Sequence, residues 1–277
     1  MESLMRATGP RLTISEERRR SLSDSSPGIP TLGPKFTHIM HYIIRVLKSW
    51  PRLMAVHGLS QLPPFIHTLQ LTERIPTPLV DCLTLVKMWA DYTEASASLV
   101  QRTVLQEVRR ILQEHSSYTA SGDILAAAQA LLILLIILFF GFRDDQVIDH
   151  SSGAQLLIDV WEVKQNLAAT GLFLEAEIDH RLPSWKDWAI VSAKRQLGPF
   201  PAPTARYLWH QTDEATWITN YMQWLRLWKD GVYRTAELFH VERGEPLDER
   251  GELWLAETDE LGVMLMAEVN AVAGVDE

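Results

Sequence analysis

Two small groups of side chains in this sequence have a spacing that could support chemistry. Asp144, Asp145 and Asp149 form an Asp-Asp-x-x-x-Asp pattern directly after a long apolar segment. Carboxylate oxygens are the ligands that Mg²⁺ prefers, together with the oxygens of a substrate phosphate. His38 and His41 lie three residues apart, so both would face one side of a helix, but no nearby carboxylate or third histidine completes a metal site.

In a helical, tryptophan-rich chain the aspartate pattern resembles that of class I terpene synthases, in which aspartates hold magnesium against a diphosphate. The spacing is one residue longer than the usual Asp-Asp-x-x-Asp, and the second metal motif of that family is absent downstream. A Mg²⁺-dependent terpene-synthase-like enzyme using Asp144, Asp145 and Asp149 is therefore kept as an alternative. A solvated helix terminus also explains these acids.

The remaining sequence features argue against most catalytic classes. We find no glycine-rich phosphate loop, no His-Glu-x-x-His, no serine elbow and no Cys-x-x-Cys. The sequence therefore predicts no enzyme, no catalytic or metal-binding residue and no cofactor. Cys82 is the one cysteine, which excludes an internal disulfide. The net charge of −9 opposes binding to a polyanion, which needs clustered Lys and Arg.

The elements that would position any site are organised around one apolar segment. From Ile124 to Phe140 only Gln129 is polar, and a helix that is apolar on every side must be buried in a protein core or in a membrane. We expect Ser121-Gly122-Asp123 to start this helix and Gly141 to end it. The flanks lack clustered Lys and Arg, and the neighbouring segments are amphipathic. A buried core helix is favoured, and a membrane span at 124–140 is kept as an alternative.

Before this segment, residues 1–35 are rich in Ser, Pro, Gly and Arg and predict a flexible tail, followed by one helical domain over 36–277. An amphipathic helix begins at Phe36, and we expect Pro51 to stop or restart it. A further helix begins after Pro78 and has a continuation that carries Leu99 to Leu112. Cys82 lies on its apolar face, as a small buried hydrophobe would.

After this segment, the spacing of apolar residues predicts a helix from Ala154 to Leu167. A second helix should begin at Ser184, whose spacing to Asp187 is that of a capping box, and a third should begin near Asp213. We expect the final helix to run from Trp254 to Val272. Tryptophans at helical spacing are expected in the core, and no alternating strand is found, so the predicted fold class is all-α.

Four groups of motifs, taken in order, resemble a known family. They are Trp50-Pro-Arg-Leu-Met54 with Leu62-Pro-Pro-Phe-Ile-His67 and Pro78-Leu79 to Cys82; Ser117-Tyr118 with Gly122-Asp123 and Gln129-Ala130-Leu131; Phe200-Pro-Ala-Pro203 with Leu208-Trp209, Trp217, Tyr221 and Trp224-Leu225; and Trp254-Leu-Ala-Glu257 with Asp259-Glu260 and Met264-Leu-Met266. From about residue 36 to the end, the chain is similar to the regulatory region of fungal zinc-cluster (six-cysteine) transcription factors, in the subgroup tied to secondary-metabolite gene clusters.

The resemblance implies a helical, nuclear regulator of transcription, with a cytoplasmic location as the alternative. The chain departs from the family in two places. With one cysteine it lacks the ligands of a zinc cluster, so no DNA-contacting residue is carried over. Only residues 196–199 separate the helix of Trp185 and Trp188 from the Pro-Ala-Pro segment, which is consistent with a truncated or degenerate copy. We therefore expect action through protein partners, including dimerisation with a full-length relative, with no direct DNA binding and no membrane contact. The resemblance names no small-molecule effector.

Overall fold

The computed structural model describes residues 4–5, 34–142, 150–197, 202–233, 237–238 and 246–272. Its α-helices are α2 (Pro34–His57), α3 (Thr77–Ala90), α4 (Ala97–Glu114), α5 (Ser121–Phe140), α6 (His150–Ala169), α7 (Glu175–Ile178), α8 (Trp185–Gln196), α9 (Arg206–Trp209), α10 (Glu214–Leu227), α12 (Glu249–Glu257) and α13 (Glu260–Val272). Short 3₁₀ helices span η1 (Gly58–Ser60) and η2 (Thr68–Leu71). The predicted all-α class is confirmed.

One short antiparallel pair of strands interrupts this helical pattern. β1 (Leu4–Met5) pairs with β2 (Phe173–Leu174), with Leu4 opposite Leu174 and Met5 opposite Phe173. No alternating pattern was predicted here, because two-residue strands are too short to show one. Of the predicted tail over 1–35, residues 1–3 and 6–33 lie outside the described residues, and 34–35 belong to α2.

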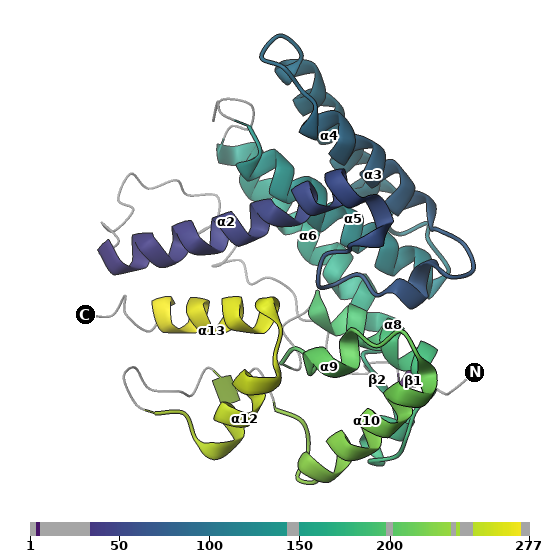
Figure 1. Cartoon of the computed structure of the whole chain (residues 1–277). Coiled ribbons are helices and arrows are strands. Elements are labelled where there is room, and N and C mark those ends of the chain that lie inside the picture. Colours follow the sequence, from purple (N-terminus) through teal and green to yellow (C-terminus); the bar gives the residue numbers. More distant parts are fainter. Residues whose placement is uncertain are drawn as a thin grey trace.

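Helix α5 is the centre of the larger hydrophobic core, as its composition predicted. It packs against α2, α3, α4, α6 and α8, which surround it in Figure 1. Thirteen of its residues are buried, from Leu125 to Leu138. Among the described residues it is the one helix that is long and apolar enough to cross a membrane. The amphipathic helices packed around it give it the protein environment that a core helix requires.

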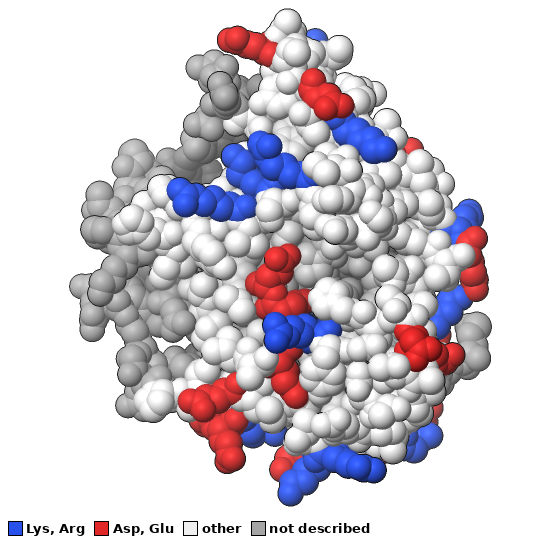
Figure 2. All heavy atoms as spheres, in the orientation of Figure 1, with Lys and Arg blue, Asp and Glu red and all other residues white. Residues whose placement is uncertain are grey.

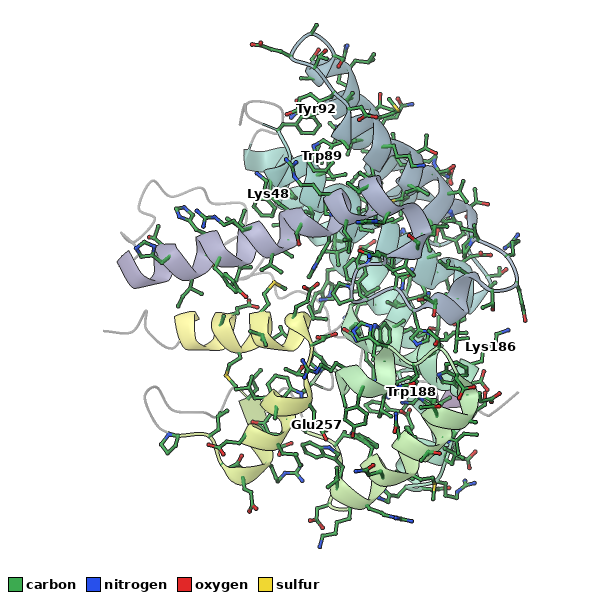
Figure 3. All side chains as sticks on the ribbon, in the orientation of Figure 1. Lys48, Trp89, Tyr92, Lys186, Trp188 and Glu257 are labelled. Atoms are coloured by element: carbon green, nitrogen blue, oxygen red, sulfur yellow. The ribbon has the colours of Figure 1, made fainter. Side chains whose placement is uncertain are left out.

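Polar groups contact both ends of α5. Asp123 in its first turn pairs with Arg74 at 3.2 Å, while no side chain caps the helix start at Ala120. At the far end the backbone N–H of Gly141 donates to Ile137, and Trp89 Nε1 donates to the Gly141 carbonyl at 3.2 Å. Figure 3 labels Trp89 where α3 approaches this end of the helix. A methyl group at Gly141 would lie only 2.7 Å from that indole nitrogen, which explains why glycine stands there.

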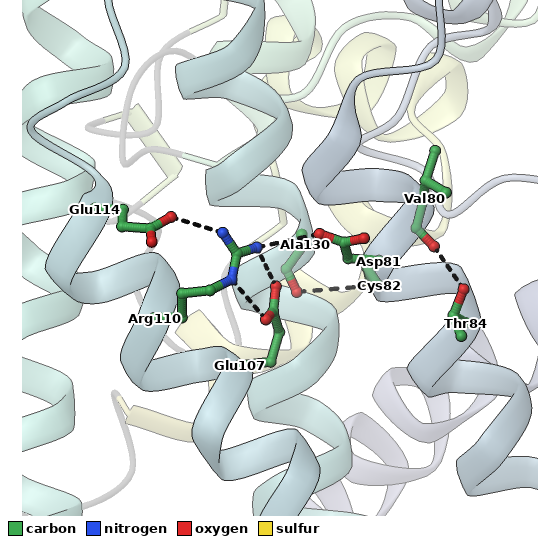
Figure 4. Close-up of polar contacts among 8 residues, drawn as sticks. All are labelled: Val80, Asp81, Cys82, Thr84, Glu107, Arg110, Glu114 and Ala130. Carbon is green, nitrogen blue, oxygen red and sulfur yellow. Dashed lines mark hydrogen bonds and ion pairs between the residues drawn. The ribbon is translucent and has the colours of Figure 1, made fainter.

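The contact between α3, α4 and α5 combines a buried thiol with an ion-pair network at its edge (Figure 4). Cys82 is fully buried, with its Sγ 3.9 Å from the Ala130 carbonyl of α5, as its position on the apolar face predicted. Arg110 of α4 forms ion pairs with Glu107 and Glu114 at 2.6 Å and with Asp81 of α3 at 3.2 Å. These pairs join the two helices outside the apolar contact.

Three predicted helix boundaries are wrong. Helix α2 continues through Pro51, although proline removes one backbone donor, because Trp50 and Met54 on either side are buried in the core and hold the helix there. The predicted continuation of α3 is a separate helix, α4, after a turn in which the Ser96 hydroxyl accepts a hydrogen bond from the Thr93 N–H.

The third wrong boundary lies near the C-terminus, where the predicted last helix is two helices. Thr258 is extended, and the Asp259 carboxylate accepts hydrogen bonds from the N–H groups of Leu261 and Gly262. This carboxylate caps a new helix, α13, which packs on α2. By contrast, the predicted starts at Ser184 and Asp213 are confirmed, since each side chain accepts a hydrogen bond from the backbone N–H three residues later.

Candidate functional site: an aromatic pocket

Tryptophans of α8, α10 and α12 and Trp228 form two further hydrophobic clusters beside the α5 core. In the first, Trp188 of α8 lies against Trp217 and Tyr221 of α10, with ring centroids 5.2 and 6.1 Å apart. In the second, Tyr233 stacks on Trp254 of α12 at 5.2 Å and also faces Trp228. The predicted role of tryptophan as core holds for most of these side chains.

Between the two clusters the packing leaves a pocket of about 300 Å³. Its wall combines segments that are far apart in the sequence: β2 and α7, α8, residues 202–205, the end of α10, residues 231–233 and α12. The aromatic rings that line it are those of Phe173, Trp188, Trp224, Trp228, Tyr233 and Trp254. A concave, mainly apolar site with a few polar groups is the usual form of a small-molecule site, and this volume lies at the lower end of the usual range.

Glu257 is the polar group on the α12 side of the pocket. Its two carboxylate oxygens each accept one hydrogen bond, from Trp228 Nε1 at 3.0 Å and from the Tyr207 hydroxyl at 3.2 Å. Figure 3 shows Glu257 in the space between α12 and the neighbouring α9 and α10. Burial, followed by the nearby Glu257 charge, raises the pKa of Tyr207, so the phenol stays a hydrogen-bond donor. No described residue forms an ion pair with Glu257.

The opposite wall carries a charge pair that neutralises itself. Arg195 of α8 makes a two-pronged contact with the Glu177 carboxylate of α7, with both N–O distances at 2.9 Å. Glu177 also accepts the Leu174 N–H, and Arg195 donates to the Ser192 hydroxyl. The pair is almost fully buried, and its opposite charges cancel within the site.

The pocket is also lined by one residue with unusual backbone geometry. His180 has a φ of 56°, in the left-handed region that side chains other than glycine rarely adopt. Its ring Nε2 lies 2.8 Å from the Leu225 carbonyl at the end of α10, a contact in which the ring nitrogen donates. This bond between α10 and the turn after α7 compensates the local strain and holds a lining residue of the pocket in place.

The sequence-based candidates lie elsewhere. Asp144, Asp145 and Asp149 fall outside the described residues, so the magnesium hypothesis stays a prediction. Its test is Mg²⁺-dependent consumption of a prenyl diphosphate that Asp144→Asn abolishes. His38 and His41 are both exposed on α2. Within the described ranges, no group of three His, Cys, Asp or Glu side chains could hold a metal ion.

Sequence reasoning did not find the pocket. It assigned Trp228 and Trp254 to the core, which is correct for their burial, and gave Glu257 no role. One signal was present: Glu257 follows Trp254 by three residues, so a carboxylate and an aromatic ring share one face of a short helix. That spacing is too common to identify a site without the tertiary structure.

Comparisons of the chain with protein-family models, with curated proteins and with solved structures found no match.

Proposed function

We propose that this chain is a transcription-factor-like regulatory domain that acts through contacts with other proteins. The proposal follows the resemblance to the regulatory region of fungal zinc-cluster factors. It includes a nuclear location and control of a fungal gene cluster, with a full-length relative as one candidate partner. Because these 277 residues contain a single cysteine, contact with DNA through a zinc cluster would have to come from outside them.

One observation carries this proposal: the motif groups that resemble the family bond to one another in the tertiary structure. Trp50 Nε1 donates to Glu260 at 2.8 Å, across 210 residues of sequence. Trp254 Nε1 donates to the Pro203 carbonyl at 3.1 Å, and both groups are buried. The first and the fourth motif groups thus contact each other through side chains.

The same pattern holds for the middle motifs. Gln129 of α5 donates to the Phe65 carbonyl at 2.6 Å, and the His67 ring lies edge-on to Trp209 at 4.7 Å. Contacts between the motif groups are what one domain built from these motifs requires. The contacts therefore favour treating the motifs as one unit.

The surface charge supports a protein partner rather than a nucleic acid. Figure 2 shows basic side chains over α2 and acidic ones over α12, with no continuous basic face in this view. A nucleic-acid site needs clustered Lys and Arg that displace counterions from phosphates, and the overall charge of −9 opposes this.

The test is a transcription assay with the whole chain fused to a heterologous DNA-binding module in a fungal nucleus. The expected result is a change in reporter expression relative to the module alone. A matched fusion carrying Leu131→Asp, which places a charge in the α5 core, should lose the effect. A folded, nuclear fusion that leaves expression unchanged would contradict the proposal.

A second measurement addresses DNA directly. The unfused chain should not retain a random pool of duplex DNA at physiological salt, because too few clustered cations are available. Sequence-specific retention under these conditions would show that the chain reads DNA by itself, contrary to the proposal.

A further inference from the structure

The pocket between α7, α8, α10 and α12 combines electron-rich rings with one carboxylate that has no ion-pair partner among the described residues. We propose that it is a binding site for a small organic cation with an apolar or aromatic body, held by Glu257 and the surrounding indole and phenol rings. This inference rests on the pocket alone and is independent of the regulatory proposal.

The size of the pocket limits the ligand. A cavity of about 300 Å³ corresponds to roughly ten water molecules at about 30 Å³ each in the liquid. That space fits a single ring with a short side chain. The walls that such a ring would contact are apolar, since Trp228, Tyr233 and Trp254 are each nearly fully buried and present little besides ring surface.

The charges of the pocket select a cation. Glu177 and Arg195 neutralise each other through two bonds, which leaves Glu257 as the lining charge that has no ion-pair partner within the described ranges. Each Glu257 oxygen accepts one hydrogen bond and keeps a further lone pair for a ligand ammonium. An anion entering the same space would meet this carboxylate in a partly dehydrated site and be repelled.

The aromatic rings add to this preference. A cation within about 6 Å of an indole or phenol face is attracted by the ring quadrupole, and more strongly where water is excluded. The protein already uses Trp228 in this way, since the Arg250 guanidinium lies 5.4 Å from its ring centroid. Arg250 does not line the pocket, and it pairs with Glu237 at 3.3 Å, so its charge is compensated.

The experiment compares three probes that share a phenyl ring and differ in charge: phenethylammonium, 2-phenylethanol and 3-phenylpropanoate. Binding to the full chain is measured by calorimetry and by quenching of tryptophan fluorescence at pH 8, where an alkylammonium with a pKa near that of lysine, about 10.4, is charged. We expect the cation to bind about tenfold more tightly than the alcohol, a ratio that corresponds to about 1.4 kcal/mol. The carboxylate should bind most weakly.

Two variants assign the preference to one side chain. Glu257→Gln keeps the shape of the side chain and removes the charge, so it should abolish the preference for the cation while the alcohol binds as before. Glu252→Gln on the same helix removes an exposed charge outside the pocket and should leave all three affinities unchanged.

Three results would overturn the inference. One is equal or tighter binding of the alcohol or the carboxylate by the native chain. Another is the absence of binding by every probe at millimolar concentration to a folded chain. The third is an equal loss in Glu252→Gln and Glu257→Gln, which would indicate general surface charge. The probe series on the native chain decides the question even if Glu257→Gln does not fold.

Discussion

Replacing Gln129 by leucine should destabilise the protein, although it makes the central helix wholly apolar. Gln129 is fully buried in α5, where its Nε2 donates to the Phe65 carbonyl at 2.6 Å. Its amide also pairs in both directions with the amide of Gln70, at 3.1 and 3.2 Å. Leucine has a similar size but can form none of these bonds.

The size of the destabilisation follows from the polar groups that lose Gln129 as a hydrogen-bond partner. Phe65 is fully buried, so its carbonyl would lose its partner without access to water, which costs about 1–3 kcal/mol. Gln70 is only half-buried and its amide can turn to solvent, so the loss of its bonds to Gln129 costs less free energy. We expect a net decrease of about 2 kcal/mol in the free energy of unfolding, which would lower the urea midpoint by roughly 0.5–1 M.

The assay is urea unfolding followed by tryptophan fluorescence, with Gln101→Leu as the matched control. Gln101 is buried on α4 but forms no hydrogen bond with a described residue, so replacing it by leucine leaves no described partner unpaired and should not lower the free energy of unfolding. If Gln129→Leu were as stable as the native chain or more stable, the dependence of the Phe65 carbonyl on Gln129 would be refuted. That result is also the one expected of a lipid-facing helix, because removing an amide favours insertion into hydrocarbon.

Three further predictions follow from buried polar groups. Trp50→Phe should lower the free energy of unfolding by about 1–3 kcal/mol, because it removes the 2.8 Å hydrogen bond to Glu260 while keeping a ring in the core. Urea unfolding measures this change, and an unchanged urea midpoint would contradict the prediction. Burial raises the pKa of Asp259 to about 6, above its ordinary value of about 3.9. Between about pH 4 and 6 the folded chain therefore binds more protons at Asp259 than the unfolded chain does. The contribution of Asp259 to the free energy of unfolding should fall as pH rises through that range. The free energy of unfolding of the native chain minus that of Asp259→Asn, measured across that range, should decrease as pH rises. A difference that does not change with pH would contradict this prediction. Burial raises the pKa of the Cys82 thiol, so a disulfide reagent should modify the native chain far more slowly than the urea-unfolded chain, and equal rates would contradict the buried position.

Local sequence information was sufficient wherever the physical cause is local. Sixteen of the seventeen positions from Ile124 to Phe140 are apolar, and they predicted the central helix because such a helix has no polar side to present to water. The capping spacing of Ser184 and the aromatic spacing that begins near Asp213 were enough to place two helix starts, and each side chain bonds to backbone only three residues away. Cys82 was predicted to be buried from its place on one helix face.

The errors arose where tertiary packing outweighs local preference. Pro51 favours a break, but the burial of Trp50 and Met54 in one core is worth more than the lost backbone bond. The strong apolar pattern from Trp254 onward concealed the N-cap at Asp259, which turns the chain so that α13 can pack on α2. The pairing of Leu4 with Leu174 spans most of the chain and leaves no local signal.

The sequence by itself determined that the chain is helical, that it has a central apolar helix, and that these residues hold too few cysteines for a six-cysteine zinc cluster. Only the tertiary structure decided that Glu257 and the rings of Trp228, Tyr233 and Trp254 enclose one pocket. These residues come from three separate segments, and each also looks like an ordinary core or surface residue in its own helix or loop. A binding site depends on which surfaces remain uncovered after packing, and that is a property of the whole fold rather than of any one segment.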